Sequence, residues 1–170
     1  MTAGSDGVDY GKLIDEEKTR QGSAIAAAKA QKKREIDLIA FFRGVEIEVG
    51  REMAMANLEL KKRGSPVIAG PFRPLREEEK IELTFGTRQP CCRLTLQGID
   101  IAAGLASIQA ELLDNRGRTT SRIQYIIEGE GQTLRAYRPL VEGVPDRAAE
   151  LTAAQLAQEV VPGIIRGRFS

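Results

Sequence analysis

The chain has 170 residues, of which 42% are hydrophobic and 29% charged, and its formal net charge is +1. A chain of this length can bury a sizeable core as one domain, and a net charge near zero gives no global field that selects nucleic acid, membranes or acidic ligands. Histidine is absent, which removes the commonest general base and the commonest metal ligand. We therefore expect a non-catalytic protein with no cofactor and no bound metal.

The ends and the cysteines predict a location. No apolar run approaches the ~18 residues of a transmembrane helix, and residues 1–8 lack the basic start and apolar stretch of a secretory signal. Cys91 and Cys92 are adjacent and do not make a disulfide framework. We expect a cytoplasmic protein with no membrane partner.

A long helix is the first predicted element. Helical propensity rises from Asp9 but weakens at Gly22-Ser23, so we predict a flexible, partly helical arm over residues 1–22 and a long helix over residues 23–63. Gly64 suits a left-handed C-cap and Pro66 prevents continuation. If the whole segment were helical it would be too long for a compact domain to cover, so part of it must project or pair.

The apolar spacing of this helix predicts where it packs. Steps of three and four form a stripe that predicts a core-facing surface: Ile39, Phe42, Val45, Val49, Met53, Ala56 and Leu60. Six further residues widen the stripe: Ile36, Leu38, Phe41, Ile47, Met55 and Leu58. The width predicts coverage on two sides, by the chain's own sheet and by a second chain. Gly44 and Gly50 are either tolerated or mark close approach of another backbone.

The period of the pattern changes from 3.6 to 2 after a connector predicted at residues 64–80. Alternation of apolar and polar residues predicts a sheet over residues 81–140, with strands near 81–85, 92–96, 108–112, 123–127 and 134–137. Half-exposed strands joined by short turns favour an antiparallel meander of four or five strands. The alternation shifts at Gly98, which predicts a bulge.

A short helix is predicted over residues 151–165. Thr152 and Gln155 match a capping box, while Pro162-Gly163 should end or kink the helix. The predicted fold class is α+β, with a long N-terminal helix, the antiparallel meander and a short C-terminal helix, both helices on one face of the sheet.

Four groups of residues invite a chemical interpretation. A basic stretch over residues 18–34 is suited to phosphates, or forms a solvated helix face, or pairs with Asp15, Glu16 and Glu17 of a neighbouring chain. Adjacent cysteines in a strand point to opposite faces, so one buried thiol is expected rather than a metal site. The acids Glu77, Glu78, Glu79 and Glu82 favour a solvated strand entry over a cation site. A polar sheet face suits either a ligand or cross-strand pairs: Glu82, Thr84, Arg93, Thr95, Gln109, Glu111 and Gln124.

The leading hypothesis is an assembly or adaptor protein that forms a homo-oligomer, most simply a dimer, or docks a protein partner through the long helix. Its interface residues would be Ile39, Phe42, Val49 and Met53, because centrally buried anchors dominate interfaces. One alternative is a binding module for a small apolar ligand between sheet and helix. The other is nucleic-acid binding through residues 18–34, with Lys29, Lys32, Lys33 and Arg34 as the anionic-partner site.

Overall fold

The computed structural model describes residues 8–77, 80–87, 90–100, 105–129 and 131–169. The chain divides into two compact units, Met1–Ile36 and Asp37–Ser170. Helix α1 (Tyr10–Lys62) begins in the first unit and ends in the second. We call residues 10–36 the arm and Asp37–Ser170 the domain. This boundary lies further along the chain than residue 22, where the sequence pattern placed the end of an arm.

Helix α1 is continuous through Gly22 and Ser23. A glycine costs about 1 kcal/mol in a helix interior, but the following alanine-rich residues are the strongest helix formers and outweigh that cost. The predicted C-terminus is confirmed. Gly64 has φ 65°, its N–H donates to the carbonyl of Lys61 at 3.0 Å, and the N–H of Ser65 donates to that of Leu60 at 2.9 Å. These two bonds form a Schellman motif.

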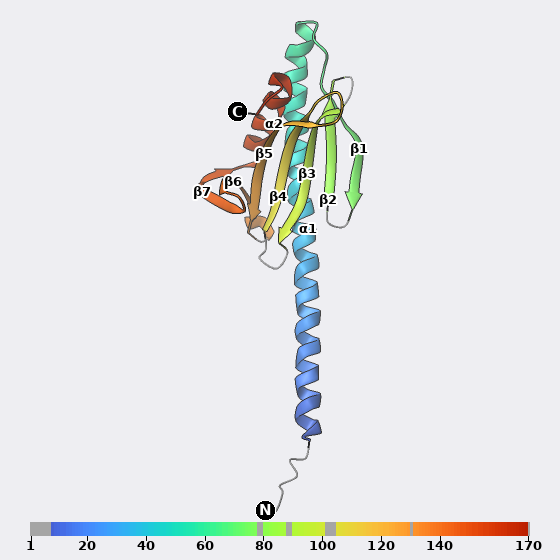
Figure 1. Cartoon of the computed structure of the whole chain (residues 1–170), viewed down its shortest axis with the longest axis vertical. Helices are drawn as coiled ribbons and strands as arrows, with labels where there is room; N and C mark the ends of the chain where they lie inside the picture. Colours follow the sequence, from blue (N-terminus) through green and yellow to red (C-terminus); the bar gives the residue numbers. More distant parts are fainter. Residues whose placement is uncertain (1–7, 78–79, 88–89, 101–104, 130, 170) are drawn as a thin grey trace, which may run out of the picture. The chain divides into compact units, whose positions relative to one another are not determined.

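The described strands form one antiparallel sheet in the order β1-β2-β3-β4-β5-β6-β7 (Figure 1). Their bounds are β1 Ala69–Glu77, β2 Lys80–Gly86, β3 Pro90–Asp100, β4 Leu105–Leu113, β5 Thr119–Glu128, β6 Arg135–Val141 and β7 Val144–Leu151. The meander is confirmed, and β2 to β6 correspond to the five predicted strands. A register shift between Gly98 and Asp100 confirms the predicted bulge.

The sheet is larger than predicted, because the four- to five-strand estimate missed both edge strands. The residues predicted as a connector contain β1, and β7 follows the predicted end of the sheet at residue 140. The register of β1 shifts on either side of Phe72, in the two intervals that contain Pro71 and Pro74. Proline lacks the N–H of a ladder and is confined to edge strands and bulges. The prolines therefore interrupt the sequence pattern of the two edge strands, β1 and β7, and these strands were not predicted.

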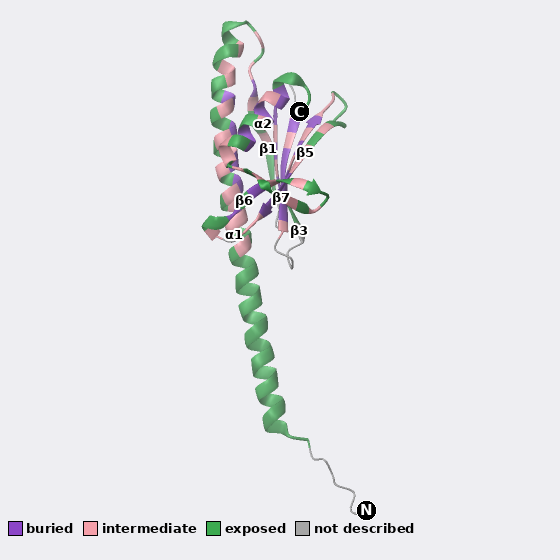
Figure 2. Ribbon diagram, turned by 90° about the vertical axis from the view of Figure 1, so that its left-hand side faces the viewer, coloured by how far each residue is buried: buried purple, intermediate pink, exposed green. Residues whose placement is uncertain are grey.

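One face of the sheet packs on both helices. Cross-strand partners Leu83, Leu94 and Ala110 share this face, as do Leu96, Ile108 and Tyr125. Helix α1 contributes Phe42, Val45, Val49 and Met53 to the same core, and α2 (Ala153–Arg166) contributes Leu156, Ala157, Val160, Val161 and Ile164. The buried segments concentrate where these elements face one another (Figure 2). Both helices thus lie on one face, as predicted.

Helix α2 also packs against the domain part of α1, where Gln158 donates to Glu52 at 3.4 Å. The predicted capping box of Thr152 and Gln155 is present. Of the two alternatives for Pro162-Gly163, an end or a kink, the helix does not end there, because α2 continues to Arg166 and is capped by Gly167, φ 69°. Burial of Val161 and Ile164 offsets the hydrogen bond lost at the proline.

Candidate interaction surface on helix α1

The predicted interface residues lie within the domain's own core. Phe42 and Val49 are 0% exposed and Met53 is 6% exposed, while Ile39 is partly buried against the core. Packing within the chain therefore accounts for their apolar character without a second chain. The interface role of these four residues stays a prediction, and the exposed apolar residues of α1 are better placed to meet a partner.

The residues that widen the stripe divide into two groups. Leu38 and Phe41 pack against the core. By contrast, Ile36, Ile47, Met55 and Leu58 are 57–63% exposed. The side of the helix that a second chain was predicted to cover is therefore exposed to solvent in this chain. Its apolar residues are not the four that were predicted as the interface.

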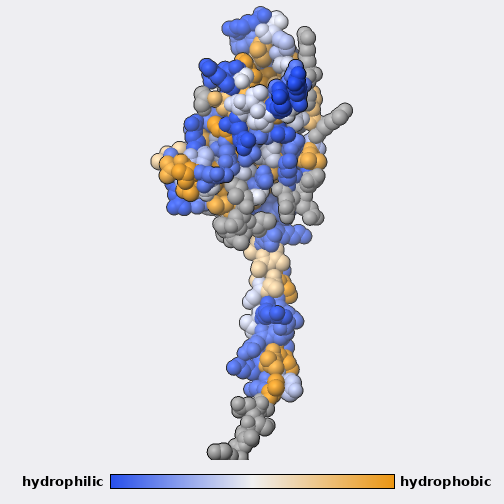
Figure 3. Space-filling view, in the orientation of Figure 1, coloured by the Kyte–Doolittle hydropathy of each residue, from blue (hydrophilic) through white to orange (hydrophobic). Residues whose placement is uncertain are grey.

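The exposed aliphatic residues of the arm follow a regular spacing. Ile14, Ile25 and Ile36 stand eleven residues apart and are 54%, 59% and 58% exposed. Eleven residues are three helical turns plus about 20°, so the three side chains lie on one face of the arm. Hydrophobic patches alternate with hydrophilic ones along the arm in Figure 3. In the domain, Ile47 and Leu58 continue the same spacing along the chain and are also exposed.

The row of exposed isoleucines at residues 14, 25 and 36 was not predicted from the sequence. Searching for apolar residues at steps of three and four left Ile25 as the one sizeable apolar residue of the basic stretch. The signal that identifies this row is the eleven-residue period itself, because residues eleven apart lie on nearly the same face of a straight helix. The arm also exposes Tyr10 and Leu13, at 71% and 50%.

Four lysines of the arm lie on or beside the face of the isoleucines. At about 100° per residue, Lys18, Lys29 and Lys32 fall within about 40° of Ile25 around the helix axis, and Lys33 within about 80°. All four lysines are exposed, whereas Arg34 is half-buried. No ion pair joins these lysines to an acid among the residues that the structure describes. Of the four predicted residues, Lys29, Lys32 and Lys33 thus lie on one exposed face, whereas Arg34 lies on the opposite side of the helix.

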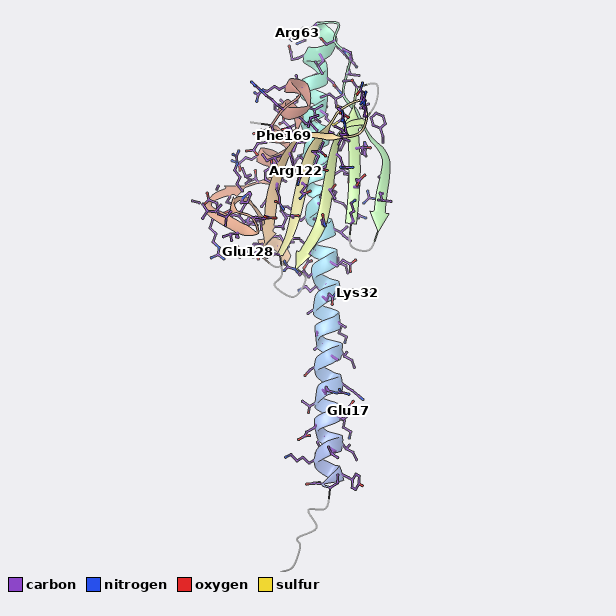
Figure 4. The ribbon with its side chains drawn as sticks, in the orientation of Figure 1. Glu17, Lys32, Arg63, Arg122, Glu128 and Phe169 are labelled. Atoms are coloured by element: carbon purple, nitrogen blue, oxygen red, sulfur yellow. The ribbon has the colours of Figure 1, made fainter. Side chains whose placement is uncertain are left out.

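The acids lie nearer the start of the arm. Glu17 accepts hydrogen bonds from Arg20 at 2.8 Å and Gln21 at 3.1 Å, and these bonds lower the pKa of Glu17. Glu16 is 3.9 Å from the ammonium of Lys12. Figure 4 labels Glu17 and Lys32, which stand about four helical turns apart. The acids at residues 15–17 thus stand among Lys12, Lys18 and Arg20, whereas residues 29–33 carry lysines and no acid.

Three glycines in the interior of α1 are not required by contacts within the described chain. Apart from the adjoining helix backbone, no described heavy atom lies within 4 Å of a Cβ added at Gly22, Gly44 or Gly50. Each of these positions costs helix stability relative to alanine. The sequence left two alternatives for Gly44 and Gly50, simple tolerance or close approach of another backbone. No other described segment of this chain makes such an approach.

The polar face of the sheet is a second candidate. The predicted residues do share a face, because Thr84, Arg93 and Glu111 are successive cross-strand partners, as are Glu82, Thr95 and Gln109. Arg93 donates to Glu111 at 2.7 and 2.9 Å, and Arg122, labelled in Figure 4, lies 3.5 Å from the same carboxylate. Such a ladder satisfies its own charges, which favours the structural alternative of cross-strand pairs.

Burial disfavours ionisation of the two cysteines and of Tyr125. Cys92 is 0% exposed, as expected of one buried thiol, and its burial raises the pKa of that thiol to about 12. Burial also raises the pKa of Cys91. Tyr125 donates to Glu159 at 2.7 Å, which also pairs with Arg138, and burial raises the Tyr125 pKa. This network ties α2 to β5 and β6.

The acidic residues Glu77, Glu78, Glu79 and Glu82 are the last group for which the sequence raised a cation site. Glu78 and Glu79 lie outside the described residues, and Glu82 pairs with Lys80 at 3.0 Å. Among the described residues, no group of three or more acidic or cysteine side chains could hold a metal ion. None of the described helices is both long and apolar enough to span a membrane.

Comparisons with known proteins add no assignment. No protein family model, curated protein or solved structure is significantly similar to the chain.

Proposed function

We propose that the protein is a non-catalytic assembly or adaptor protein that self-associates through helix α1. The observation that carries the proposal is the row of exposed isoleucines at eleven-residue spacing on the arm. Single exposed apolar residues are ordinary on a protein surface, but apolar residues repeated at a fixed spacing on one face of a helix favour helix pairing. A right-handed coiled coil is the form of pairing that an eleven-residue period favours.

The edges of the sheet support the helix as the contact. Open edge strands are the other common route by which sheet proteins associate. Here β1 carries Pro71 and Pro74, and β7 carries Pro145, and the register shifts at both edges. Prolines and bulges on edge strands are devices that prevent strand addition. Association by strand pairing is therefore disfavoured, whereas the arm carries no such protection.

The size of the apolar row predicts a weak association. Burying a half-exposed isoleucine contributes ~1 kcal/mol, so six of them in a pair contribute ~6 kcal/mol. Association costs at least ~4 kcal/mol in lost translational and rotational freedom. The isoleucines therefore leave a net gain of at most about 2 kcal/mol, whereas a micromolar complex needs about 8 kcal/mol. Even with further contacts from Tyr10, Leu13 and the alanines, we expect a dissociation constant above the micromolar range.

Sedimentation velocity on the full chain tests the proposal. The wild type should show a mass that rises with concentration above the 18.6 kDa of one chain. The triple substitution Ile14→Ser, Ile25→Ser and Ile36→Ser should remain at one chain and keep the wild-type domain stability. A wild type that stays at one chain at every accessible concentration removes the proposal.

A matched control uses another exposed apolar surface. Leu140 and Val141 on β6 are 68% and 61% exposed. Leu140→Ser with Val141→Ser should leave the association unchanged. Loss of association in this variant, and not in the isoleucine variant, would place the contact on the β6–β7 hairpin and contradict the role of α1.

Nucleic-acid binding through residues 18–34 is the second candidate, favoured by the unpaired lysines that share one face of the arm. It predicts binding to a duplex oligonucleotide that weakens steeply with salt and is lost when Lys29, Lys32 and Lys33 become Ala. The arm lacks aromatic residues between its bases that could stack on single strands. Binding of a small apolar ligand stays a prediction, since the interior between sheet and helices holds one cluster of buried side chains.

A further inference from the structure

The eleven-residue repeat of α1 includes charged residues as well as apolar ones. The apolar row at this spacing consists of Ile14, Ile25, Ile36, Ile47 and Leu58. A base stands four residues after all of them except Ile36, at Lys18, Lys29, Arg51 and Lys62. An acid directly follows all of them except Ile25, at Asp15, Asp37, Glu48 and Glu59. Four residues correspond to about 40° around a helix and one residue to about 100°, so the repeat sets bases beside the apolar row and acids further from it.

In the arm this arrangement leaves one face without acids. Lys18, Lys29 and Lys32 lie within about 40° of Ile25, on both sides of it, whereas the acids of the arm lie at least about 80° away. The three lysines are exposed, and no ion pair joins them to an acid among the described residues. We call Ile14, Lys18, Ile25, Lys29, Lys32 and Ile36 the isoleucine face. It is apolar along its centre and positively charged beside the centre.

The domain part of α1 repeats the arrangement on its own exposed side. Ile47 and Leu58 are 57% and 63% exposed, and Arg43 and Arg51 lie about 40° from Ile47 on opposite sides. Arg51 pairs with Glu48 at 2.6 Å, but an exposed pair of this kind contributes little and leaves the guanidinium accessible. Core packing explains the buried side of this segment. It does not explain a repeat of apolar and basic residues on the exposed side.

We propose that the isoleucine face of the arm lies on an anionic lipid surface, with the helix parallel to the membrane plane. A helix at such a surface places its apolar side chains at the boundary between headgroups and acyl chains. Lysines beside them lay their aliphatic stems along the apolar layer and keep their ammonium groups among the anionic headgroups. The acids, which lie further around the helix, then face water.

This kind of contact needs neither a membrane-spanning helix nor a large net charge. The chain was expected to have no membrane partner because it has no long apolar run and a net charge of +1. Local charge decides a surface contact, since the attraction of an anionic surface falls off within a Debye length. The acid-free face of the arm therefore meets the requirement that the whole chain does not.

The apolar centre of the face favours lipid over nucleic acid. The phosphates of a duplex suit the lysines equally well, but Ile25 would then be buried against a charged backbone. A second arm would bury the isoleucines, as in the proposed self-association, so lipid and a second copy compete for the same face. Lipid binding does not depend on that self-association, and each is tested without the other.

Co-sedimentation of the full chain with vesicles tests the proposal. At about 0.1 M salt, the chain should bind vesicles of equal parts phosphatidylcholine and phosphatidylserine, and bind vesicles of phosphatidylcholine alone much more weakly. Each lysine near an anionic surface contributes about fivefold in affinity, so Lys29→Gln with Lys32→Gln should weaken binding about 25-fold. Absence of binding to the anionic vesicles, or equal binding to both kinds, overturns the proposal.

A matched variant separates the isoleucine face from the total charge of the arm. Lys12 and Arg20 are exposed and lie about 140° from Ile25. Lys12→Gln with Arg20→Gln removes the same charge as the lysine variant. It should weaken vesicle binding by less than about threefold, because charges on the far side of a helix are largely screened at this salt concentration. Equal losses in the two double variants would show that binding follows net charge, which overturns the role of the face.

Two further measurements distinguish lipid from the other occupants. Ile25→Ser should weaken vesicle binding about fivefold but should leave binding to a duplex oligonucleotide unchanged. A chain that binds the duplex and not the vesicles overturns the proposal in favour of nucleic acid. In sedimentation velocity, Lys29→Gln with Lys32→Gln should not weaken self-association, since it removes like charges from the face. A chain that self-associates but does not bind anionic vesicles overturns the lipid contact and leaves the proposed function standing.

Discussion

The two parts of α1 belong to one helix but differ in what stabilises them. In the domain, Phe42, Val45, Val49 and Met53 are buried against the sheet and α2. In the described part of the arm, no residue is buried. The domain part is held by tertiary packing, which supplies most helical stability in proteins, whereas the arm depends on alanine-rich propensity and local ion pairs. Substitutions should therefore change stability in one part and association in the other.

The largest difference in stability between the arm and the domain is expected for substitutions of large apolar residues. Phe42→Ala removes a side chain that is 0% exposed and should lower the free energy of unfolding by about 3–5 kcal/mol, measured by urea denaturation followed by circular dichroism. Ile25→Ala, at an exposed position, should change it by less than about 0.5 kcal/mol while weakening association. Similar losses of stability in both variants would contradict the division between arm and domain.

A smaller effect is expected at a part-buried pair of hydrogen bonds. The amide of Asn57 donates to the carbonyl of Ile68 and accepts from its N–H, both at 2.8 Å. Ile68 is 3% exposed, so Asn57→Ala leaves both backbone groups without a partner and should cost about 2–3 kcal/mol. Gln21→Ala in the arm removes an exposed bond to Glu17 and should leave the unfolding midpoint unchanged. A neutral Asn57→Ala would mean that water replaces the lost bonds.

The same contrast explains what the sequence could predict of the fold. The central strands β2 to β6 alternate because one face is buried, so their pattern is readable. The edge strands β1 and β7 have one neighbour each and contain prolines, so their alternation is weak and they were missed. At Pro162 the sequence left an end and a kink open, and burial of α2 carries the helix past this local breaker to Arg166.

The surface of α1 was predicted less well than its core. The sequence predicted an apolar segment covered on two sides, but it could not separate Phe41 from Ile47, since both are large apolar residues beside the core-facing stripe. Packing alone decides that Phe41 contacts the core and that Ile47 is 57% exposed. The residues chosen for the interface pack in or against the domain's own core, and their interface role stays a prediction.

Alkaline pH should destabilise the domain through its buried thiol. The pKa of Cys92 is raised from 9.0 to about 12 in the folded chain, so above pH 9 the unfolded chain releases a proton that the folded chain retains. Stability from this group is complete below pH 9 and falls by about 1.4 kcal/mol per pH unit until about pH 12. Cys92→Ala should give a shallower decline over this window in urea denaturation. An identical slope would show that other groups cause it.

The finest comparison places one substitution in both parts of α1. Ala27 in the arm and Ala54 in the domain are both exposed, and Ala27 lies opposite Ile25 around the helix axis, away from the apolar row. Glycine costs about 1 kcal/mol in a helix interior. Ala54→Gly should lower the unfolding free energy of the domain by about that amount, because this part of α1 unfolds together with the core.

Ala27→Gly should leave the domain's unfolding midpoint unchanged, because the arm is not part of that cooperative unit. Its cost should appear as faster amide hydrogen exchange in peptides from residues 10–36, by about fivefold for ~1 kcal/mol of local opening. Equal shifts of the midpoint in the two variants would show that α1 unfolds as one unit from end to end. Packing in the domain would then also stabilise the arm helix, and its exposed isoleucines would be presented on a preformed helix even in the monomer.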